Sequence, residues 1–413
     1  MSFPKMARFR QRFAAEALDD VVGTVVAQLR ACDLAGHIQR GQRIAVTGGS
    51  RGIANISIIT RTVVDAVRAA GGEPFVMPAM GSHGGATAAG QKEILASYGL
   101  SEANMGCPVE ATMDVVELGQ LDDDTPILVN RLAHEADGIV VVNRVKPHTS
   151  FRGSHESGVV KMLTIGLGCH RGAMMAHAQG AQGLARLIPA LGEALLAKLN
   201  VVAGIALVET AYDETASVTA LRPEEFLSGE PKLLAQARTN MPRILARNID
   251  LLIVDEMGKD ISGTGMDTNV IGRMMLPGVK EPDEPGVSRI FVRRLSDKTH
   301  GNANGVGLSD VVTKQLFDSI DFDATYANAF TSTFLNRAYI PIIKAHDREA
   351  IAAMFEVLRI DDGATARVAR IVNTLDVRHL ELSEPLARTS DHPDLERVGE
   401  FEEMRFDDGG ALI

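Results

Sequence analysis

The chain has 413 residues, of which 45% are hydrophobic and 23% charged, and its formal net charge is −11. A chain of this length favours two domains, its composition excludes general disorder, and its acidic balance argues against nucleic acid as the main partner. Three widely spaced cysteines, and no apolar run near the ~20 residues of a membrane span, predict a cytoplasmic protein with neither a disulfide scaffold nor a membrane partner.

The first half of the chain alternates short apolar runs with helical patterns. We expect strands at 43–47, 74–80 and 138–145, from the runs RIAVT, PFVMPAM and GIVVVNRV. Helices are expected at 56–72 and 87–99, where apolar residues recur at helical spacing. Strands that alternate with helices indicate βαβ units and a parallel sheet.

The second half begins with one more strand in LNVVAGIALVETAYDE and a mixed stretch to about residue 240. A new strand and helix series then starts at NIDLLIVDEMGKD, with later strands in SRIFVRRLS and NTLDVRHLELS. We therefore predict an α/β protein of two domains. Residues 1–240 are expected to form an N-terminal cofactor-binding, catalytic domain with a parallel, Rossmann-like sheet, and residues 241–413 a smaller C-terminal α/β domain.

Three loops follow expected strands at the carboxyl ends, where parallel sheets bind ligands. The loop TGGSRG contains Ser50 and Arg51, and the loop MGSHGGAT places His83 between glycines that let a ligand approach the backbone. The loop NRVKPHTSFRGSHESG contains His148 and His155. Because a histidine titrates near neutral pH, two of them on separate loops can exchange protons with a small substrate from opposite faces. The alternative is that each is an ordinary polar loop residue.

The third loop also carries three cations, Arg144, Lys146 and Arg152. They, or Arg51, would hold a substrate carboxylate or a cofactor phosphate. A solvated surface cluster is the alternative.

Lys161 lies in the apolar stretch SGVVKMLTIGLG, where desolvation would lower its pKa and make the amine nucleophilic. A lysine whose packed stem reaches the surface is the alternative. Further on, His170 and His177 are seven residues apart, so they share a face if one continuous helix contains both.

The stretch RIAVTGGSRGIANIS has the strand, glycine turn and helix start of a nucleotide-binding turn. Ala54 stands at the third glycine position, however, and no acidic residue closes the second strand. None of the four tyrosines has a lysine four residues later. We therefore expect a phosphate- or carboxylate-binding turn here and not the NAD site of a dehydrogenase.

Taken in order, Arg51, GSHGGAT, KPHTSFRGSHESGVVKMLTIGLG and HRGAMMAH resemble the nickel-dependent lactate racemase family of 2-hydroxy acid racemases and epimerases. The resemblance spans about residues 40–215 and continues more weakly into VDEMGKDISGTGMDTNV and HGNANGVGLSD. It implies an isomerase with an active site in the cleft between the domains. It also implies a nickel-pincer nucleotide (nickel pyridinium-3,5-bisthiocarboxylic acid mononucleotide), attached to a lysine through a thioamide, with one protein histidine on the nickel.

Carried over by this resemblance, His83 and His148 correspond to the two catalytic histidines and Lys161 to the cofactor-anchoring lysine. His177 corresponds to the nickel ligand because it lies sixteen residues after that lysine, and His170 is the other candidate.

Three further residues, Ser50, Arg51 and Lys259, correspond to cofactor-binding positions, although the role of Lys259 does not align securely. The chain departs from lactate racemases at Gly48, where they carry an acidic residue, and it has no tryptophan to cover the pincer ring. The thirteen residues from His148 to Lys161 also form a longer gap than is expected. These departures concern the substrate more than the chemistry, and the broader family is expected to act on other 2-hydroxy acids, dicarboxylic and sugar acids included.

The resemblance implies inversion at C2 through a 2-keto acid, with hydride passing to and from the cofactor and the two histidines handling the hydroxyl proton. The expected partners are a small 2-hydroxy acid and the enzymes that make the cofactor. The subunit count stays open, a homo-oligomer included. The alternatives are a non-catalytic relative that binds an anion or a metal and, less favoured, an NAD-type dehydrogenase.

Overall fold

The computed structural model describes residues 2–49, 52–122 and 124–413, and the chain divides into two compact units. The N-terminal unit comprises Ala15–Met241, and the C-terminal unit comprises Met1–Ala14 with Pro242–Ile413. The sequence placed residues 1–14 in the N-terminal domain. They lie instead in the C-terminal unit, because the strand that they contain pairs with that unit's sheet and buries Ala7 and Phe9 in its core. No helix within the described ranges combines the length and apolar character that crossing a membrane requires.

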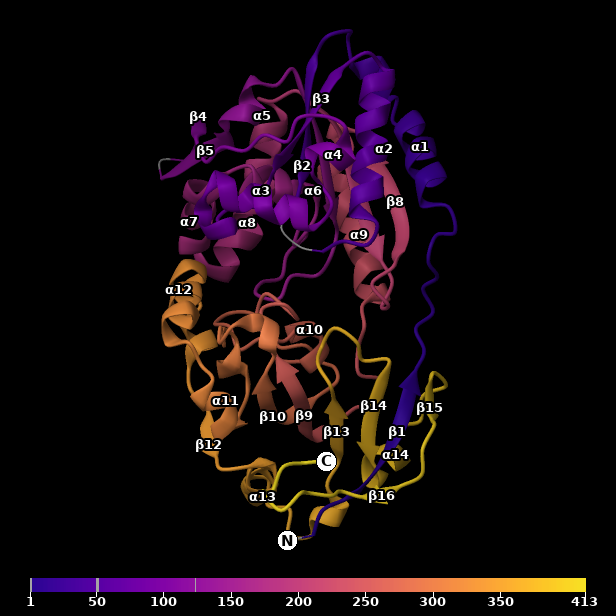
Figure 1. The fold of residues 1–413 in the computed structure, drawn as a ribbon, viewed down its shortest axis with the longest axis vertical. Coiled ribbons are helices and arrows are strands. Elements are labelled where there is room, and N and C mark those ends of the chain that lie inside the picture. The colour runs from indigo at the N-terminus through magenta and orange to yellow at the C-terminus, as the bar shows by residue number, and fades with distance from the viewer. Residues whose placement is uncertain (1, 50–51, 123) are drawn as a thin grey trace. The chain divides into compact units, whose positions relative to one another are not determined.

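The N-terminal unit alternates strands and helices (Figure 1). Its strands are β2 (Arg43–Gly48), β3 (Glu73–Pro78), β4 (Val115–Asp122), β5 (Thr125–Asn130), β6 (Gly138–Arg144), β7 (Val201–Glu209) and β8 (Thr215–Leu221). Its α-helices are α1 (Val21–Ala31), α2 (Ile56–Ala69), α3 (Ala88–Ser97), α4 (Glu102–Met105), α5 (Arg131–Glu135), α6 (Val159–Lys161), α7 (Cys169–Ala178), α8 (Gly180–Leu196) and α9 (Phe226–Asn240). Short helical turns are η1 (Leu34–His37), η2 (Gly84–Ala86), the π-helical η3 (Met162–Gly166) and η4 (Pro223–Glu225).

The main sheet of this unit has the order β3-β2-β6-β7-β8. Its first four strands are parallel and β8 is antiparallel at the edge, while β4 and β5 form a separate hairpin. The strands and helices expected in this half of the chain are confirmed, and so is the parallel α/β class.

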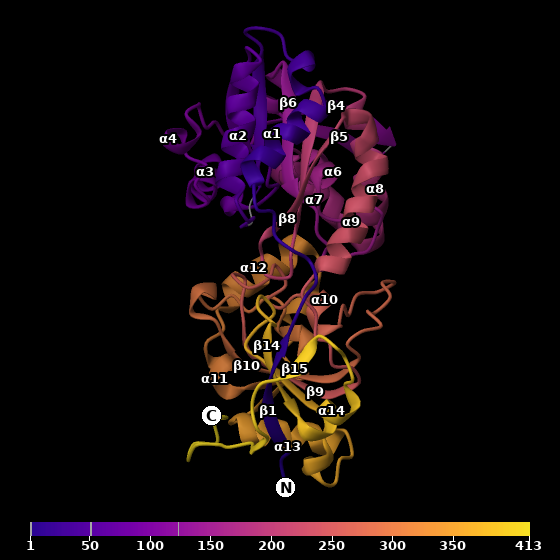
Figure 2. The same ribbon diagram turned by 90° about the vertical axis from the view of Figure 1, so that its right-hand side faces the viewer.

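Helices cover both faces of this sheet, with α1 and α2 on one side and α8 and α9 on the other (Figure 2). α2 buries Ile59, Val63 and Val67, which are spaced at about one turn and pack into the core cluster with α1 and the strands. On the other face, a Cβ at Gly204 of β7 would lie 2.5 Å from the ring of Phe226. Glycine there lets the first residue of α9 pack directly on the strand.

The C-terminal unit is a second mixed α/β layer structure (Figure 1). Its strands are β1 (Lys5–Gln11), β9 (Ile249–Met257), β10 (Val287–Leu295), β11 (Val311–Thr313), β12 (Ile342–Lys344), β13 (Val368–Ile371), β14 (His379–Ser383), β15 (Leu395–Arg397) and β16 (Glu402–Glu403). Its helices are α10 (Thr268–Ile271), η5 (Asp297–Thr299), η6 (Val306–Leu308), α11 (Lys314–Asp318), α12 (Phe322–Ser332), η7 (Leu335–Ala338), α13 (Asp347–Val357), η8 (Gly363–Thr365) and α14 (Glu384–Thr389). The sheet order is β12-β11-β10-β9-β13-β14-β1-β15, with β16 also on β1. Neighbouring strands are parallel along the run β12-β11-β10-β9-β13, and the other neighbouring pairs are antiparallel.

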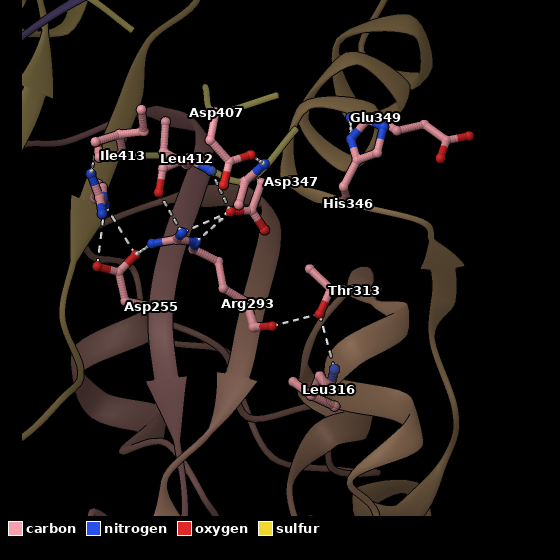
Figure 3. A network of polar contacts seen from close by, with 12 residues as sticks. Asp255, Arg293, Thr313, Leu316, His346, Asp347, Glu349, Asp407, Leu412 and Ile413 are labelled. Atoms are coloured by element: carbon pink, nitrogen blue, oxygen red, sulfur yellow. Dashed lines mark hydrogen bonds and ion pairs between the residues drawn. The ribbon is translucent and has the colours of Figure 1, made fainter. Parts of the chain in front are cut away.

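A buried network of charges ties this sheet to the last residues of the chain (Figure 3). Arg293 of β10 donates to Asp255 of β9 at 2.9 Å and to Asp347 at the start of α13 at 2.8 Å. Its remaining nitrogen donates to the backbone carbonyl of Leu412 at 2.6 Å, and the N–H of Leu412 donates back to Asp347 at 2.7 Å. Every member is thereby paired, which buried charges require.

Candidate functional site

The segment 159–166, which comprises α6 and η3, lies against the loops that follow β2 and β3. A Cβ at Gly49, just after β2, would lie 3.0 Å from the methyl carbon of Met162. The N–H of Gly81, after β3, donates to the carbonyl of Gly166 at 3.1 Å. Two carboxyl-end loops of the parallel sheet therefore meet at the segment that contains Lys161. Ser50 and Arg51 follow Gly49 but lie outside the described residues, so their cofactor-binding roles stay predictions.

The loop that follows β6 reaches the same segment. The side-chain amide of Asn143 donates to the carbonyl of Gly158, directly before α6, at 3.0 Å. Lys146 and Ser157 exchange both backbone hydrogen bonds, at 2.9 and 3.2 Å, and so close the loop into a hairpin-like excursion. His148 lies within this excursion, near its start.

Glu156 organises the excursion, and the sequence reasoning missed it. Its carboxylate is fully buried and accepts hydrogen bonds from the N–H of His148 at 2.7 Å and of Gly153 at 3.1 Å. The guanidinium of Arg238 on α9 donates to it at 2.6 Å. The signal was present, because Glu156 is the one acidic residue in a loop rich in cations.

The ring of His148 is oriented by two neighbours. Its Nδ1 accepts the backbone N–H of Ser150 at 3.0 Å, and its ring lies 4.4 Å from that of Phe151, centroid to centroid. A neutral imidazole that accepts at Nδ1 carries its proton on Nε2. In this arrangement a neutral His148 is therefore a hydrogen-bond donor at Nε2.

Phe151 also joins His148 to Lys161. The ammonium nitrogen of Lys161 lies 5.6 Å from the centroid of the Phe151 ring, within the range of a cation–π contact. Lys161 is half-buried and ends α6.

One continuous helix, α7, contains both His170 and His177, which is the condition under which their spacing places them on one face. Burial, and to a smaller extent the positive charge of Lys161, together lower the pKa of His177 to about 4. At neutral pH His177 is therefore an uncharged imidazole, the form that a metal ligand needs.

The loop that contains His83 is anchored to α7 as well. Gly81 has φ +59°, and a Cβ there would lie 3.3 Å from that of Ala173, one turn before His177. The buried side chain of Gln91 donates to the carbonyls of Gly81 at 3.0 Å and His83 at 3.3 Å. His83 itself is exposed, and its loop is what links it to the group formed by His148, Lys161 and His177.

Glu230, a buried residue of α9, is a second contributor that the sequence reasoning missed. Its Oε2 accepts the N–H of Val160 at 2.9 Å at the start of α6, and burial raises its pKa to about 7. A Cβ at Gly158 would lie 2.4 Å from this carboxyl group. Glu230 therefore anchors the short helix that presents Lys161.

Two of the three cations of the third loop lie close to carboxylates of the protein. Arg144 pairs with the buried Glu209 at the end of β7. Arg152 lies 3.8 Å from Glu156 and donates to the carbonyl of Phe151 at 3.1 Å. Neither arginine matches the alternative of a solvated surface cluster, since each lies close to a carboxylate of the protein.

The internal pairing extends to the turn after β2 and to His155. Glu209 also accepts the N–H of Ala54 at 2.7 Å, just before α2. His155 is buried, with Nδ1 2.9 Å from the hydroxyl of Ser154, and burial lowers its pKa, as in an ordinary core histidine.

Lys259 belongs to the C-terminal unit, where its ammonium donates to the carbonyl of Gly263 at 2.7 Å and its N–H donates to the hydroxyl of Thr299 at 3.0 Å. Its cofactor-binding role stays a prediction. Across residues 2–49, 52–122 and 124–413, no group of three or more His, Cys, Asp or Glu side chains is placed to hold a metal ion. A nickel ion at His177 would need further ligands from the cofactor itself.

The chain is similar to a protein-family model and to solved structures. A protein-family model described as "Domain of unknown function (DUF362)" matches residues 50–223, which is less than half of the chain. No curated protein matches the chain. Among solved structures, the lactate racemase apoprotein from Thermoanaerobacterium thermosaccharolyticum is similar at 13% identity and a TM-score of 0.49, over 87% of this chain and 95% of that chain. At this score and identity the similarity by itself supports no conclusion about activity.

Proposed function

We propose that the protein is a racemase or epimerase that inverts C2 of a 2-hydroxy acid with a nickel-pincer nucleotide bound to Lys161. The observation that carries the proposal is the group His148, Phe151, Lys161 and His177. The rings of His148 and Phe151 pack together, the ammonium of Lys161 lies over the Phe151 ring, and the charge of Lys161 acts on a neutral His177. These are the residues whose order along the chain resembles the nickel-dependent lactate racemase family.

The residues fit the cofactor chemically. Lys161 offers a half-buried amine for the thioamide, and His177 offers a neutral nitrogen ligand beside it. When bound, the nickel-pincer nucleotide supplies an acceptor for the hydride that leaves C2, chemistry that no side chain provides. Ser50, Arg51 and Lys259 are proposed to hold the rest of the cofactor.

The two catalytic histidines would divide the proton transfers. His83 would take the hydroxyl proton of one enantiomer, and His148, as an imidazolium, would give a proton to the oxygen of the 2-keto acid that becomes the other enantiomer. The roles exchange in the reverse direction. Because Arg144 and Arg152 are paired with carboxylates, Arg51 is the cation of this region proposed to hold the substrate carboxylate.

The test is to coexpress the chain with the cofactor-making enzymes and to measure bound nickel, the mass of the Lys161 peptide and the racemisation of single-enantiomer 2-hydroxy acids. We expect a mass adduct on Lys161, nickel in proportion, and inversion of at least one acid. His83→Ala and His148→Ala should keep the adduct and lose inversion, whereas Lys198→Ala, at an exposed lysine, should change neither.

Two outcomes would contradict the proposal in different ways. Inversion with an unmodified Lys161 would exclude the tethered cofactor. An adduct and nickel without turnover of lactate, dicarboxylic or sugar 2-hydroxy acids would favour a non-catalytic protein that binds an anion or a metal.

A further inference from the structure

Arg337 is a buried guanidinium in the C-terminal unit that lacks the hydrogen bonds such a group requires. It lies in η7 and is 1% exposed. Its Nε, Nη1 and Nη2 have no hydrogen-bond partner among the described residues. A guanidinium carries five N–H donors, and leaving them unpaired in the interior costs far more free energy than one missing neutral hydrogen bond.

Burial lowers the pKa of Arg337 only to about 10, so the side chain is charged at neutral pH. Glu281 is the carboxylate whose charge acts on it. The two oxygens of Glu281, however, accept the backbone N–H groups of Met274 and Met275. Glu281 therefore caps its own loop and does not bond the guanidinium.

A second unsatisfied polar atom lies on the neighbouring backbone segment. Asn304 is 4% exposed, and its Oδ1 has no partner among the described residues. Its Nδ2 donates to the carbonyl of Gly263 at 3.3 Å, which fixes the orientation of the amide. The next residue, Gly305, donates its N–H to the carbonyl of Arg337 at 2.8 Å. The N–H donors of Arg337 and the acceptor oxygen of Asn304 thus lie on two segments that a backbone hydrogen bond joins.

We propose that Arg337 binds a small oxyanion, a carboxylate or a phosphate, enclosed within the C-terminal unit. The planar fork of a guanidinium matches two oxygens of such a group, and Asn304 Oδ1 would accept from a hydroxyl of the same ligand. The site involves none of the residues proposed for racemisation. Because the guanidinium is enclosed, the anion is expected to exchange slowly and to remain bound through purification.

The test uses the full chain, purified and dialysed in buffer that contains only chloride as anion. Anions released on denaturation are identified by ion chromatography and mass spectrometry, which separates inorganic phosphate from organic carboxylates. We expect about one oxyanion per chain from the wild type and from Arg405→Met, which removes an exposed arginine. Arg337→Met should release none.

Arg337→Lys covers the case in which Arg337→Met does not fold. This variant keeps the positive charge but loses the planar fork of the guanidinium, so it should bind an oxyanion more weakly. The concentration of phosphate or lactate that raises its melting temperature should therefore be at least tenfold higher than the concentration needed by wild type from which the anion has been removed. The proposal is wrong if the wild type releases no oxyanion and its melting temperature responds to added phosphate and lactate no more than that of Arg337→Lys.

Discussion

The buried carboxylate of Glu156 accepts the backbone N–H of His148 at 2.7 Å, so a residue eight positions later sets the position of a proposed catalytic histidine. The same carboxylate accepts hydrogen bonds from the N–H of Gly153 and from the guanidinium of Arg238. Because Arg238 lies on α9, its bond ties the loop to that helix. Positioning by a buried, charge-assisted hydrogen bond is stronger than positioning by exposed contacts.

Replacing Glu156 with Gln puts an amide N–H₂ group where backbone N–H groups point. We expect the free energy of unfolding to fall by about 2 kcal/mol, because buried donors lose their acceptor. Turnover of the cofactor-loaded protein should fall on the order of tenfold to a hundredfold through displacement of His148. Urea denaturation and a racemisation assay measure the two effects. Glu117→Gln, at an exposed ion pair, is the control, and full turnover in Glu156→Gln would contradict the positioning role.

His177 should make the protein less stable in acid. Its pKa is about 4 when folded and near 6.5 when unfolded, so between these values the unfolded chain binds the extra proton. The free energy of unfolding therefore rises with pH through this window, by about 3 kcal/mol from this group. Urea titrations of wild type and His177→Gln from pH 4 to pH 7 measure the difference. Identical slopes would show that His177 is not buried in its neutral form.

Glu230 should make the protein less stable as the pH rises, the opposite of the effect of His177. Its pKa is raised to about 7 in the fold from 4.5, so between these values the folded chain holds a proton that the unfolded chain has lost. Its contribution to stability is thus present below pH 4.5 and is lost as the pH rises to 7. Glu230→Gln should gain about 3 kcal/mol relative to the wild type between pH 4.5 and pH 8. Glu230→Ala should be destabilised throughout, because the Val160 amide loses its acceptor.

Arg293→Met should be strongly destabilising although Arg293 belongs to the C-terminal unit, which contains none of the proposed catalytic histidines. It leaves Asp347 without its guanidinium partner and releases the carbonyl of Leu412. Removing one member of a buried ion pair costs about 3–5 kcal/mol. Chemical denaturation checks this value against Arg405→Met, an exposed pair expected to change stability by less than about 1 kcal/mol. A loss of that small size in Arg293→Met would show that the network is not buried in solution.

The regular elements were largely predictable because their signals are local. β2, β6 and β9 are short apolar runs bounded by polar residues, and α2 repeats its apolar residues at helical spacing. β1 was not predictable as part of the C-terminal sheet, because it pairs with β14 more than 360 residues later. No local pattern encodes such a partner.

The order of chemistry-bearing residues, His83, His148, Lys161 and His177, was determined by the sequence alone, as was the parallel sheet whose strand ends present the first two. Tertiary structure decided which side chains are neutral, paired or held in place. Arg144 is neutralised by Glu209, His177 is deprotonated by burial beside Lys161, and Glu156 and Glu230 support the loop and the helix. Desolvation and charge pairing depend on which distant segments pack together, and residue order along one chain does not contain that information.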